Sequence, residues 1–250
     1  MNLRCYLPIV LVFAPTLLAE DILIVADEVP AMEVLAGQFR TRANITSKIV
    51  LQTEMPDSLK AFKTVAVYIH KDINEGPEHA FLDYLKDGGK LILLHHSISS
   101  GKRKNKDWLP VFEITLPTTK FDEGGYAYFD PATFDVVDLA PGNFVTTHEV
   151  HYAKKVAYST GGKGPEKELD AFSATDTEIY LNHQFDGPRT ELLGLKWTEP
   201  KSGRTYTQDT VGWKKKVGKG DVYYFMVGHK AGDFEIPAYA QILTNAVVSK

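Results

Sequence analysis

Short, uninterrupted runs of apolar residues constrain the fold of this chain more than any other feature. They occupy residues 21–26, 64–69 and 90–94, and each is typical of a strand that is buried on both faces. Apolar residues recur at helical spacing in residues 31–42 and 79–87, between these runs. Parallel neighbours in a sheet need crossover connections, so this alternation predicts an α/β fold with a doubly wound, mostly parallel sheet.

The second half of the chain has a less regular pattern. Residues 220–227 predict a clear strand and residues 236–248 a closing helix that begins near Pro237. Between them and the first half lie shorter strand candidates, at residues 134–138, 178–181, 192–197 and 210–214. With 250 residues and a hydrophobic fraction of 44%, the chain can bury one sizeable core, and a single domain is expected.

The first 19 residues have the features of a signal peptide. Arg4 precedes an apolar run that is interrupted by Pro8 and Pro15 and is shorter than the roughly 20 residues of a membrane-spanning helix. Cleavage after Ala19 would leave a domain of residues 20–250, in a secreted or periplasmic protein without a stable membrane span. An uncleaved anchor or a first buried strand is the alternative interpretation.

Composition excludes two classes of function. A formal net charge of -4 at pH 7 argues against a nucleic-acid partner, because such binding needs a clustered basic face. The only cysteine, Cys5, lies in the predicted signal peptide. The mature protein is therefore expected to have no disulfide and no thiolate nucleophile.

Histidines follow two of the predicted strands directly. His95, His96 and Ser97 come after residues 90–94, and Gly228 and His229 follow residues 220–227. Ligands of doubly wound sheets bind beyond the carboxyl ends of the strands, so these positions predict a shared pocket. Imidazole serves there as general base, general acid or metal ligand. The alternative is that the histidines only cap nearby backbone.

Four motifs occur in an order that resembles the ThuA-like (trehalose utilisation) family. They are Leu-His-His-Ser-Ile at 94–98, Trp-Leu-Pro-Val-Phe at 108–112, Asp-Thr-Glu-Ile-Tyr at 176–180 and Gly-Lys-Gly-Asp-Val-Tyr-Tyr-Phe-Met-Val-Gly-His at 218–229. The resemblance extends from about residue 22 to the C-terminus. It implies a flavodoxin-like sandwich related to the class I glutamine amidotransferases, and a role in carbohydrate metabolism.

The resemblance also implies which residues form the site. Related amidotransferases have a cysteine nucleophile where this chain has His95 and His96, so glutamine hydrolysis is not expected. The implied catalytic residues are His95, His96, Glu178 and His229, with substrate-binding roles for Asp176, Ser97 and Trp108. In an extended segment Asp176 and Glu178 would face the same side.

A divalent metal such as zinc is a further hypothesis, with His96 and His229 as candidate ligands. Adjacent His95 and His96 would project in opposite directions from an extended strand, so we expect only one of them to touch a given ion. His70 and His183 belong to no such pattern and are interpreted as surface or structural residues. The basic loop at residues 99–107, which contains Lys102, is either a lid for an anionic substrate or an ordinary solvated loop.

The predicted function is an exported protein that acts on a small carbohydrate or glycoside. Histidine and carboxylate chemistry would then isomerise, eliminate from or hydrolyse a sugar or keto-glycoside. The alternative is a non-catalytic carbohydrate-binding module with a degenerate amidotransferase-like pocket, so the sequence leaves open whether the protein is an enzyme.

Overall fold

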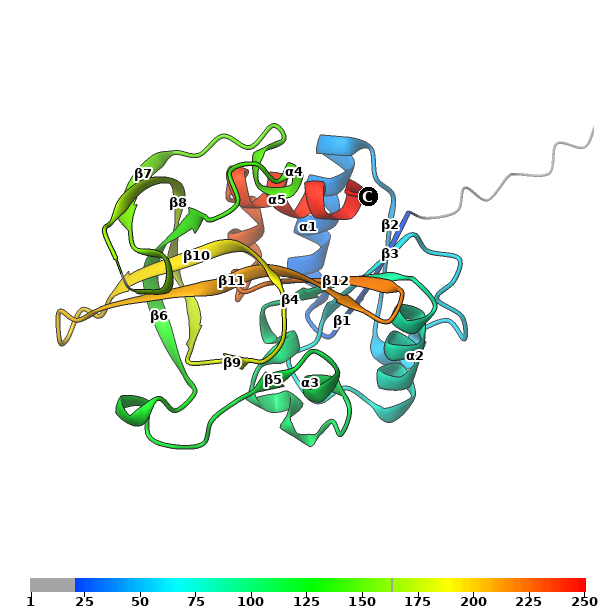
Figure 1. Cartoon of the computed structure of the whole chain (residues 1–250). Coiled ribbons are helices and arrows are strands. Elements are labelled where there is room, and N and C mark those ends of the chain that lie inside the picture. The colour runs from blue at the N-terminus through cyan, green and yellow to red at the C-terminus, as the bar shows by residue number, and fades with distance from the viewer. Residues whose placement is uncertain (1–20, 163) are drawn as a thin grey trace, which may run out of the picture.

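A computed structural model of the chain describes residues 21–162 and 164–250, and the predicted signal peptide at residues 1–19 lies outside them. One ten-stranded sheet runs through the molecule in the order β2-β1-β3-β4-β12-β11-β10-β6-β8-β7 (Figure 1). Its strands are β1 (Ile22–Ala26), β2 (Ser47–Val50), β3 (Thr64–Tyr68), β4 (Lys90–Leu94), β6 (Ala127–Asp138), β7 (Lys154–Tyr158), β8 (Lys167–Leu181), β10 (Thr190–Thr198), β11 (Thr205–Val217) and β12 (Gly220–Phe225).

The first half of the sheet is parallel, as the apolar runs predict. Strands β2, β1, β3, β4 and β12 pair in parallel, and every residue of β1 and β3 is buried. Helices cover both faces of this half (Figure 1). They are α1 (Val29–Ala43) and α5 (Pro237–Val248) on one side, with the short α4 (Phe144–Thr147), and α2 (Glu75–Lys86) and α3 (Trp108–Val111) on the other.

The second half of the sheet is antiparallel, which corrects the prediction of a mostly parallel sheet. Five of the nine strand pairings, from β12 through β11, β10, β6 and β8 to β7, are antiparallel. Short connections suffice for such pairs, so this half needs no crossover helices. A separate two-stranded sheet joins β5 (Ile114–Thr115) to β9 (Gln184–Phe185). The fold is therefore α/β with a mixed sheet.

The termini of the two long covering helices follow from the sequence. Proline lies in the first turn of α1 and of α5, where its missing N–H costs no hydrogen bond. Helix α1 ends at Asn44 in a left-handed conformation (φ 52°), which asparagine tolerates better than most residues.

No helix among the described residues is long and apolar enough to cross a membrane.

His183 is a buried histidine whose protonation opposes folding. Burial lowers its pKa to about 3, and its Nε2 has no hydrogen-bond partner among the described residues. The unfolded chain binds a proton near pH 6.5 while the folded chain does not, so stability is lost as pH falls from 6.5 toward 3.

We expect His183→Gln to remove this part of the pH dependence. Urea unfolding at pH 7, 5 and 4 measures it, because the free energy of unfolding should fall less steeply with acidification in the variant than in the wild-type protein. Equal slopes would show that His183 does not contribute. The substitution can also change packing and so shift the free energy of unfolding at pH 7. Such a shift does not affect the comparison of the two pH slopes.

Candidate functional site

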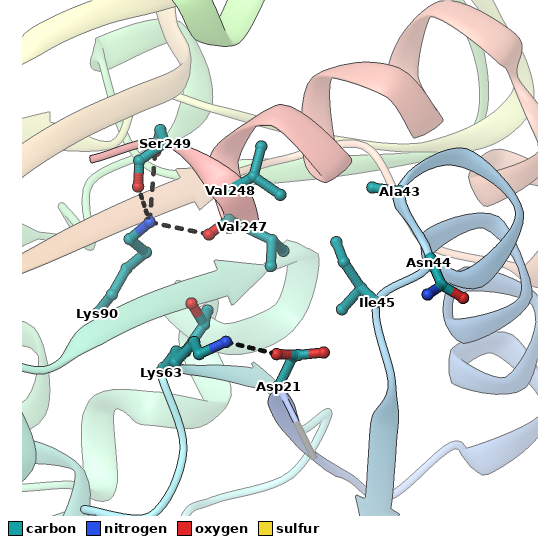
Figure 2. Close-up of a pocket in the computed structure, with 10 residues that line it drawn as sticks. Asp21, Ala43, Asn44, Ile45, Lys63, Lys90, Val247, Val248 and Ser249 are labelled. Carbon is teal, nitrogen blue, oxygen red and sulfur yellow. Dashed lines mark hydrogen bonds and ion pairs between the residues drawn. The ribbon is translucent and has the colours of Figure 1, made fainter. Parts of the chain in front are cut away.

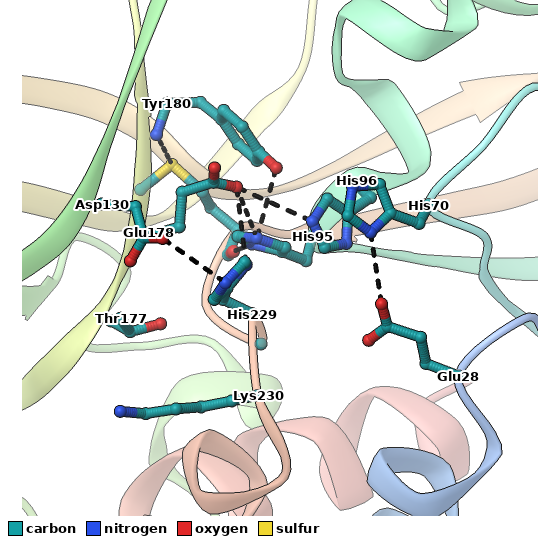
Figure 3. Close-up of polar contacts among 12 residues, drawn as sticks. Glu28, His70, His95, His96, Asp130, Thr177, Glu178, Tyr180, His229 and Lys230 are labelled. Atoms are coloured by element: carbon teal, nitrogen blue, oxygen red, sulfur yellow. Dashed lines mark hydrogen bonds and ion pairs between the residues drawn. The ribbon is translucent and has the colours of Figure 1, made fainter.

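Four side chains converge where the parallel half of the sheet meets the antiparallel half (Figure 3). His95 and His96 lie in the turn after β4, His229 follows β12, and Glu178 projects from β8. One ligand atom from each of the four lies within 4.8 Å of the others. The structure thus brings together all four residues that the sequence analysis predicted to be catalytic.

The backbone at His95 explains why both adjacent histidines reach this cluster. Residues His95–Ile98 form a 3₁₀ turn, and His95 has a φ of 43°, which is uncommon for a residue other than glycine. The chain is therefore not extended here, and the two rings lie with their centroids 4.2 Å apart. The expectation that the two side chains project in opposite directions is corrected, because strand alternation does not apply within this turn.

His95 is fully buried, and a hydrogen bond at one ring nitrogen sets the direction of the other. Its Nδ1 lies 2.5 Å from the main-chain carbonyl oxygen of Met226, which only accepts, so Nδ1 carries the proton. Its Nε2 faces the cluster, 3.0 Å from Glu178 Oε2 and 3.2 Å from the Tyr180 hydroxyl. This arrangement fixes the tautomer with Nε2 directed at the other three residues.

His96 and His229 present nitrogens that lack partners. Both ring nitrogens of His96 and Nδ1 of His229 are buried without a hydrogen bond to any described residue. His96 Nε2 and His229 Nδ1 each lie 3.7 Å from Glu178 Oε2. Burial, and then the neighbouring His95, lowers the pKa of His96 far below its usual value, so its ring is neutral. Buried imidazole nitrogens without partners are unusual, and these three are available to bind a ligand.

Glu178 is the one carboxylate within the cluster. Burial raises its pKa, but the neighbouring His95 and Tyr180 side chains outweigh burial and leave the pKa below the usual value. Burial raises the pKa of Tyr180 far above its usual range, followed by the effect of the Glu178 charge. Glu178 is therefore ionised beside a neutral phenol.

The loop that carries His229 is fastened to strand β8. Gly228 has a φ of 132°, and a Cβ atom there would lie 2.8 Å from the ring of Phe234, so only glycine fits. The Thr177 hydroxyl donates to Asp233 Oδ2 at 2.6 Å, and both side chains are buried. This contact ties the loop to the residue next to Glu178 and keeps His229 at the cluster.

His70 adjoins the cluster although the sequence analysis interpreted it as surface or structural. Its ring stacks on His96 with centroids 3.8 Å apart and planes at 12°. Glu28 Oε1 lies 3.2 Å from His70 Nδ1, and both oxygens of Asp27 accept the His70 main-chain N–H. His70 follows β3 and Glu28 follows β1, so the strand-end rule that identified His95 also applies to them.

The residues proposed to bind substrate do not join the cluster. Asp176 has a φ of 52°, which breaks the alternation along β8, and its exposed carboxylate pairs with Lys230 at 2.5 Å. Asp176 and Glu178 thus face different surroundings, which corrects the prediction that they share a side. Ser97 is buried and donates to the carbonyl oxygen of Val67 at 2.6 Å.

Trp108 and Lys102 also lie inside the protein. Trp108 has no exposed surface, and its Nε1 donates to the carbonyl oxygen of Ser97 at 2.7 Å. Lys102 is equally buried, and its Nζ donates to the carbonyl oxygen of Ile69 at 2.8 Å, among other carbonyls after β3. Lys102 thus belongs to neither a lid nor a solvated loop.

A cavity of about 500 Å³ lies at the opposite, amino end of the parallel strands (Figure 2). Its charged side chains are paired with protein groups: Lys63 Nζ lies 2.7 Å from Asp21, and Lys90 Nζ donates to the carbonyl oxygens of Val247, at 2.9 Å, and Ser249. The cavity therefore lacks the unpartnered polar atoms that distinguish the histidine cluster.

Comparison with solved structures decides the fold family. A protein described as ThuA-like from Bacteroides uniformis aligns with a TM-score of 0.60 over 98% of this chain and 96% of its own, at 17% identity. A second, from Parabacteroides merdae, aligns with a TM-score of 0.62 over 92% and 90%, at 11% identity. This chain has the ThuA-like fold. The resemblance inferred from the motifs is confirmed at the level of the fold.

The ThuA-like fold also occurs within larger proteins. A β-galactosidase from Rahnella sp. R3 matches 90% of this chain with 30% of its own length, at a TM-score of 0.50 and 12% identity. No protein-family profile matches the sequence, and no curated protein matches it. At these identities the likeness concerns the fold alone.

Proposed function

We propose that this protein is an exported, zinc-dependent enzyme that acts on a sugar or keto-glycoside. The main observation behind this proposal is that three imidazole rings and the Glu178 carboxylate converge on one point. Several of the imidazole nitrogens there are buried and have no hydrogen-bond partner among the described residues. Support for a carbohydrate comes from the motif resemblance and from the ThuA-like structural relatives. We also propose that a flavodoxin-like sheet is the framework of the site, and the strand order β2-β1-β3-β4-β12 supports this.

The donor set fits a divalent transition metal. Zinc prefers imidazole nitrogen and carboxylate oxygen, and its ligands must be deprotonated. Glu178 is ionised, His96 is neutral, and the Met226 carbonyl holds His95 with Nε2 toward the cluster. A carbonyl partner behind a histidine is the usual outer contact of a metal ligand. When bound, the ion would polarise a carbonyl or activate a water molecule.

The accessible side of the cluster defines where substrate would enter. His95 is fully buried, and the side chains of His96 and Glu178 are at most 9% exposed, whereas that of His229 is 29% exposed. Substrate would therefore approach over His229. Tyr180, whose hydroxyl contacts His95 Nε2 at 3.2 Å, stays protonated and can donate a hydrogen bond to an oxygen at the cluster.

Turnover of methyl glucosides oxidised to the ketone at one ring hydroxyl tests this proposal. We expect the zinc-loaded protein to convert at least one of them, followed by NMR, and Glu178→Gln to lose at least a hundredfold in kcat/KM. Asp176→Asn is the matched control, because Asp176 lies two residues away on the same strand but is exposed. Equal activity in both variants, or binding of these glycosides without turnover, would contradict an enzyme of this kind.

The stack of His70 on His96 predicts a measurable effect on the metal. We expect His70→Ala to weaken zinc binding roughly tenfold, because the His96 ring loses the ring that stacks on it. A tenfold loss is at the lower end of the effect of removing an outer contact of a metal ligand. His70→Phe keeps a flat ring and should restore most of the affinity. Competition with a fluorescent zinc chelator measures both. If His70→Ala and His70→Phe bind zinc with the same affinity, the stacked ring does not position His96.

A further inference from the structure

We infer that Lys102 is a positioning residue for the histidine cluster: its ammonium group holds the turn after β3, at residues 69–71, so that the His70 ring lies flat against His96. Lys102 lies in a 3₁₀ segment, Ser100–Lys104, and has no exposed surface. A lysine is almost never fully buried unless its charge is paired or hydrogen-bonded. Of the two tests of this inference, only the second rests on the proposed zinc site.

The Lys102 ammonium group contacts the main-chain carbonyl oxygens of a single turn. Its Nζ donates to those of Ile69, His70 and Lys71, at 2.8, 3.3 and 2.5 Å. Three acceptors match the three N–H groups of an ammonium ion. The turn lies between β3 and α2, so its carbonyls belong to no strand ladder or helix that would supply donors to them. Lys102 therefore supplies hydrogen bonds that regular secondary structure does not give this turn.

Asp27 holds the same turn by its N–H groups. Both carboxylate oxygens accept the main-chain N–H of His70, at 2.8 and 2.9 Å, and Oδ2 also accepts that of Lys71, at 3.2 Å. Burial lowers the pKa of Lys102 to about 8, against the opposing effect of the Asp27 and Asp72 charges, so the ammonium form predominates at pH 7. A positive group thus holds the carbonyls of the turn and a negative group its N–H groups, and charged partners form the stronger hydrogen bonds.

The His70 side chain connects this turn to the cluster. Its ring stacks on His96 with centroids 3.8 Å apart and planes at 12°, although 52% of the side chain is exposed (Figure 3). An exposed ring keeps such an orientation only where its backbone is fixed, because rotation of the turn would move the ring across its neighbour. Neither ring nitrogen of His96 has a hydrogen-bond partner among the described residues, so the orientation of His96 depends on ring contacts such as this stack.

NMR of the metal-free protein is the first test, through the ring C–H resonances of His96. A stacked ring shifts the resonances of the protons that it covers, so His70→Ala gives their positions without the stack. We expect Lys102→Met, which keeps a long apolar side chain but no donor, to move these resonances toward the His70→Ala positions. Lys90→Met is the matched control and should leave them unchanged, because Lys90 also donates to main-chain carbonyls, such as that of Val247 at 2.9 Å, but at the amino end of the parallel strands.

A double-mutant cycle for zinc affinity is the second test, and it separates positioning from general damage to the fold. If Lys102 acts through His70, Lys102→Met should weaken zinc binding by no more than the roughly tenfold expected of His70→Ala, and the double variant should bind zinc as His70→Ala does. If Lys102→Met does not fold, Lys102→Gln replaces it, since the glutamine amide is one bond shorter and brings an oxygen toward the same carbonyls.

Three results would overturn the positioning role of Lys102. They are wild-type His96 resonances in the Lys102 variant, an equal shift in Lys90→Met, and zinc losses that multiply in the double variant. Wild-type protein that binds no zinc removes the proposed enzyme but leaves the NMR comparison to decide on Lys102. Conversely, unchanged His96 resonances in a Lys102 variant that retains zinc remove only the positioning role.

Discussion

Protein equilibrated with zinc and then desalted is expected to retain about one ion per chain, and Glu178→Gln and His96→Ala are expected to retain almost none. Zinc sites of this kind use three or four protein ligands, so the loss of one removes much of the affinity. His96 offers two buried nitrogens without a protein partner, and Glu178 Oε2 is within 3.7 Å of three imidazole nitrogens. Elemental analysis of the purified proteins measures the stoichiometry.

Two controls separate metal binding at the cluster from metal bound elsewhere. Asp176→Asn removes an exposed carboxylate on the same strand, and His148→Ala removes a histidine outside the cluster, so both should retain the ion. The same test would be repeated with cobalt and with manganese. If the wild-type protein retains none of the three ions after desalting, the metal site is contradicted. The cluster would then have to act by proton transfer alone.

Most of the parallel half of the fold could be predicted from sequence, because every strand in it except the edge strand β2 is largely buried on both faces. The runs at β1, β3, β4 and β12 are continuous and apolar, so each shows its boundaries directly. The antiparallel half was harder. Strand β8 has 15 residues, of which the sequence analysis identified only the last four, because several of the first eleven are charged and exposed. One-sided strands mix polar and apolar residues and resemble loops.

The sequence predicted which residues form the site but not how they are arranged. The rule that ligands bind beyond strand ends identified His95, His96 and His229, and the resemblance added Glu178. The positive φ of His95 and of Asp176 could not be foreseen, because only a small minority of histidine and aspartate residues adopt such angles, although more often than most other residues do. These two dihedral angles decide that both adjacent histidines face the cluster and that Asp176 does not.

A similar limit applies to Trp108, which the sequence analysis placed among the substrate-binding residues. Its ring packs edge-on against Phe81, with centroids 5.7 Å apart, and against Phe112 at 5.1 Å. Both partners are buried as completely as Trp108. The structure therefore gives this tryptophan a packing role beneath the turn that carries His96, since its Nε1 holds the Ser97 carbonyl oxygen.

We accordingly expect Trp108→Ala to lower the free energy of unfolding by about 3–5 kcal/mol, the usual cost of truncating a fully buried aromatic residue. Two contributions add: the cavity left beside Phe81 and Phe112, and the unsatisfied carbonyl oxygen of Ser97. Urea unfolding at pH 7 measures the change. Trp108→Phe keeps most of the volume but not the hydrogen bond, so its loss should be smaller, about 1–3 kcal/mol.

Zinc and sugar measurements on Trp108→Phe distinguish packing from ligand contact. A residue that only packs should leave the zinc stoichiometry and the turnover of keto-glycosides unchanged in the fraction of the protein that is folded. Trp213→Phe is a suitable comparison, because Trp213 is also fully buried but its Nε1 has no partner among the described residues. Trp108→Phe should therefore cost more stability than Trp213→Phe, by about the 1 kcal/mol of one buried hydrogen bond. A selective loss of keto-glycoside turnover in Trp108→Phe, with zinc retained, would instead place the indole in contact with the substrate and contradict a role in packing alone.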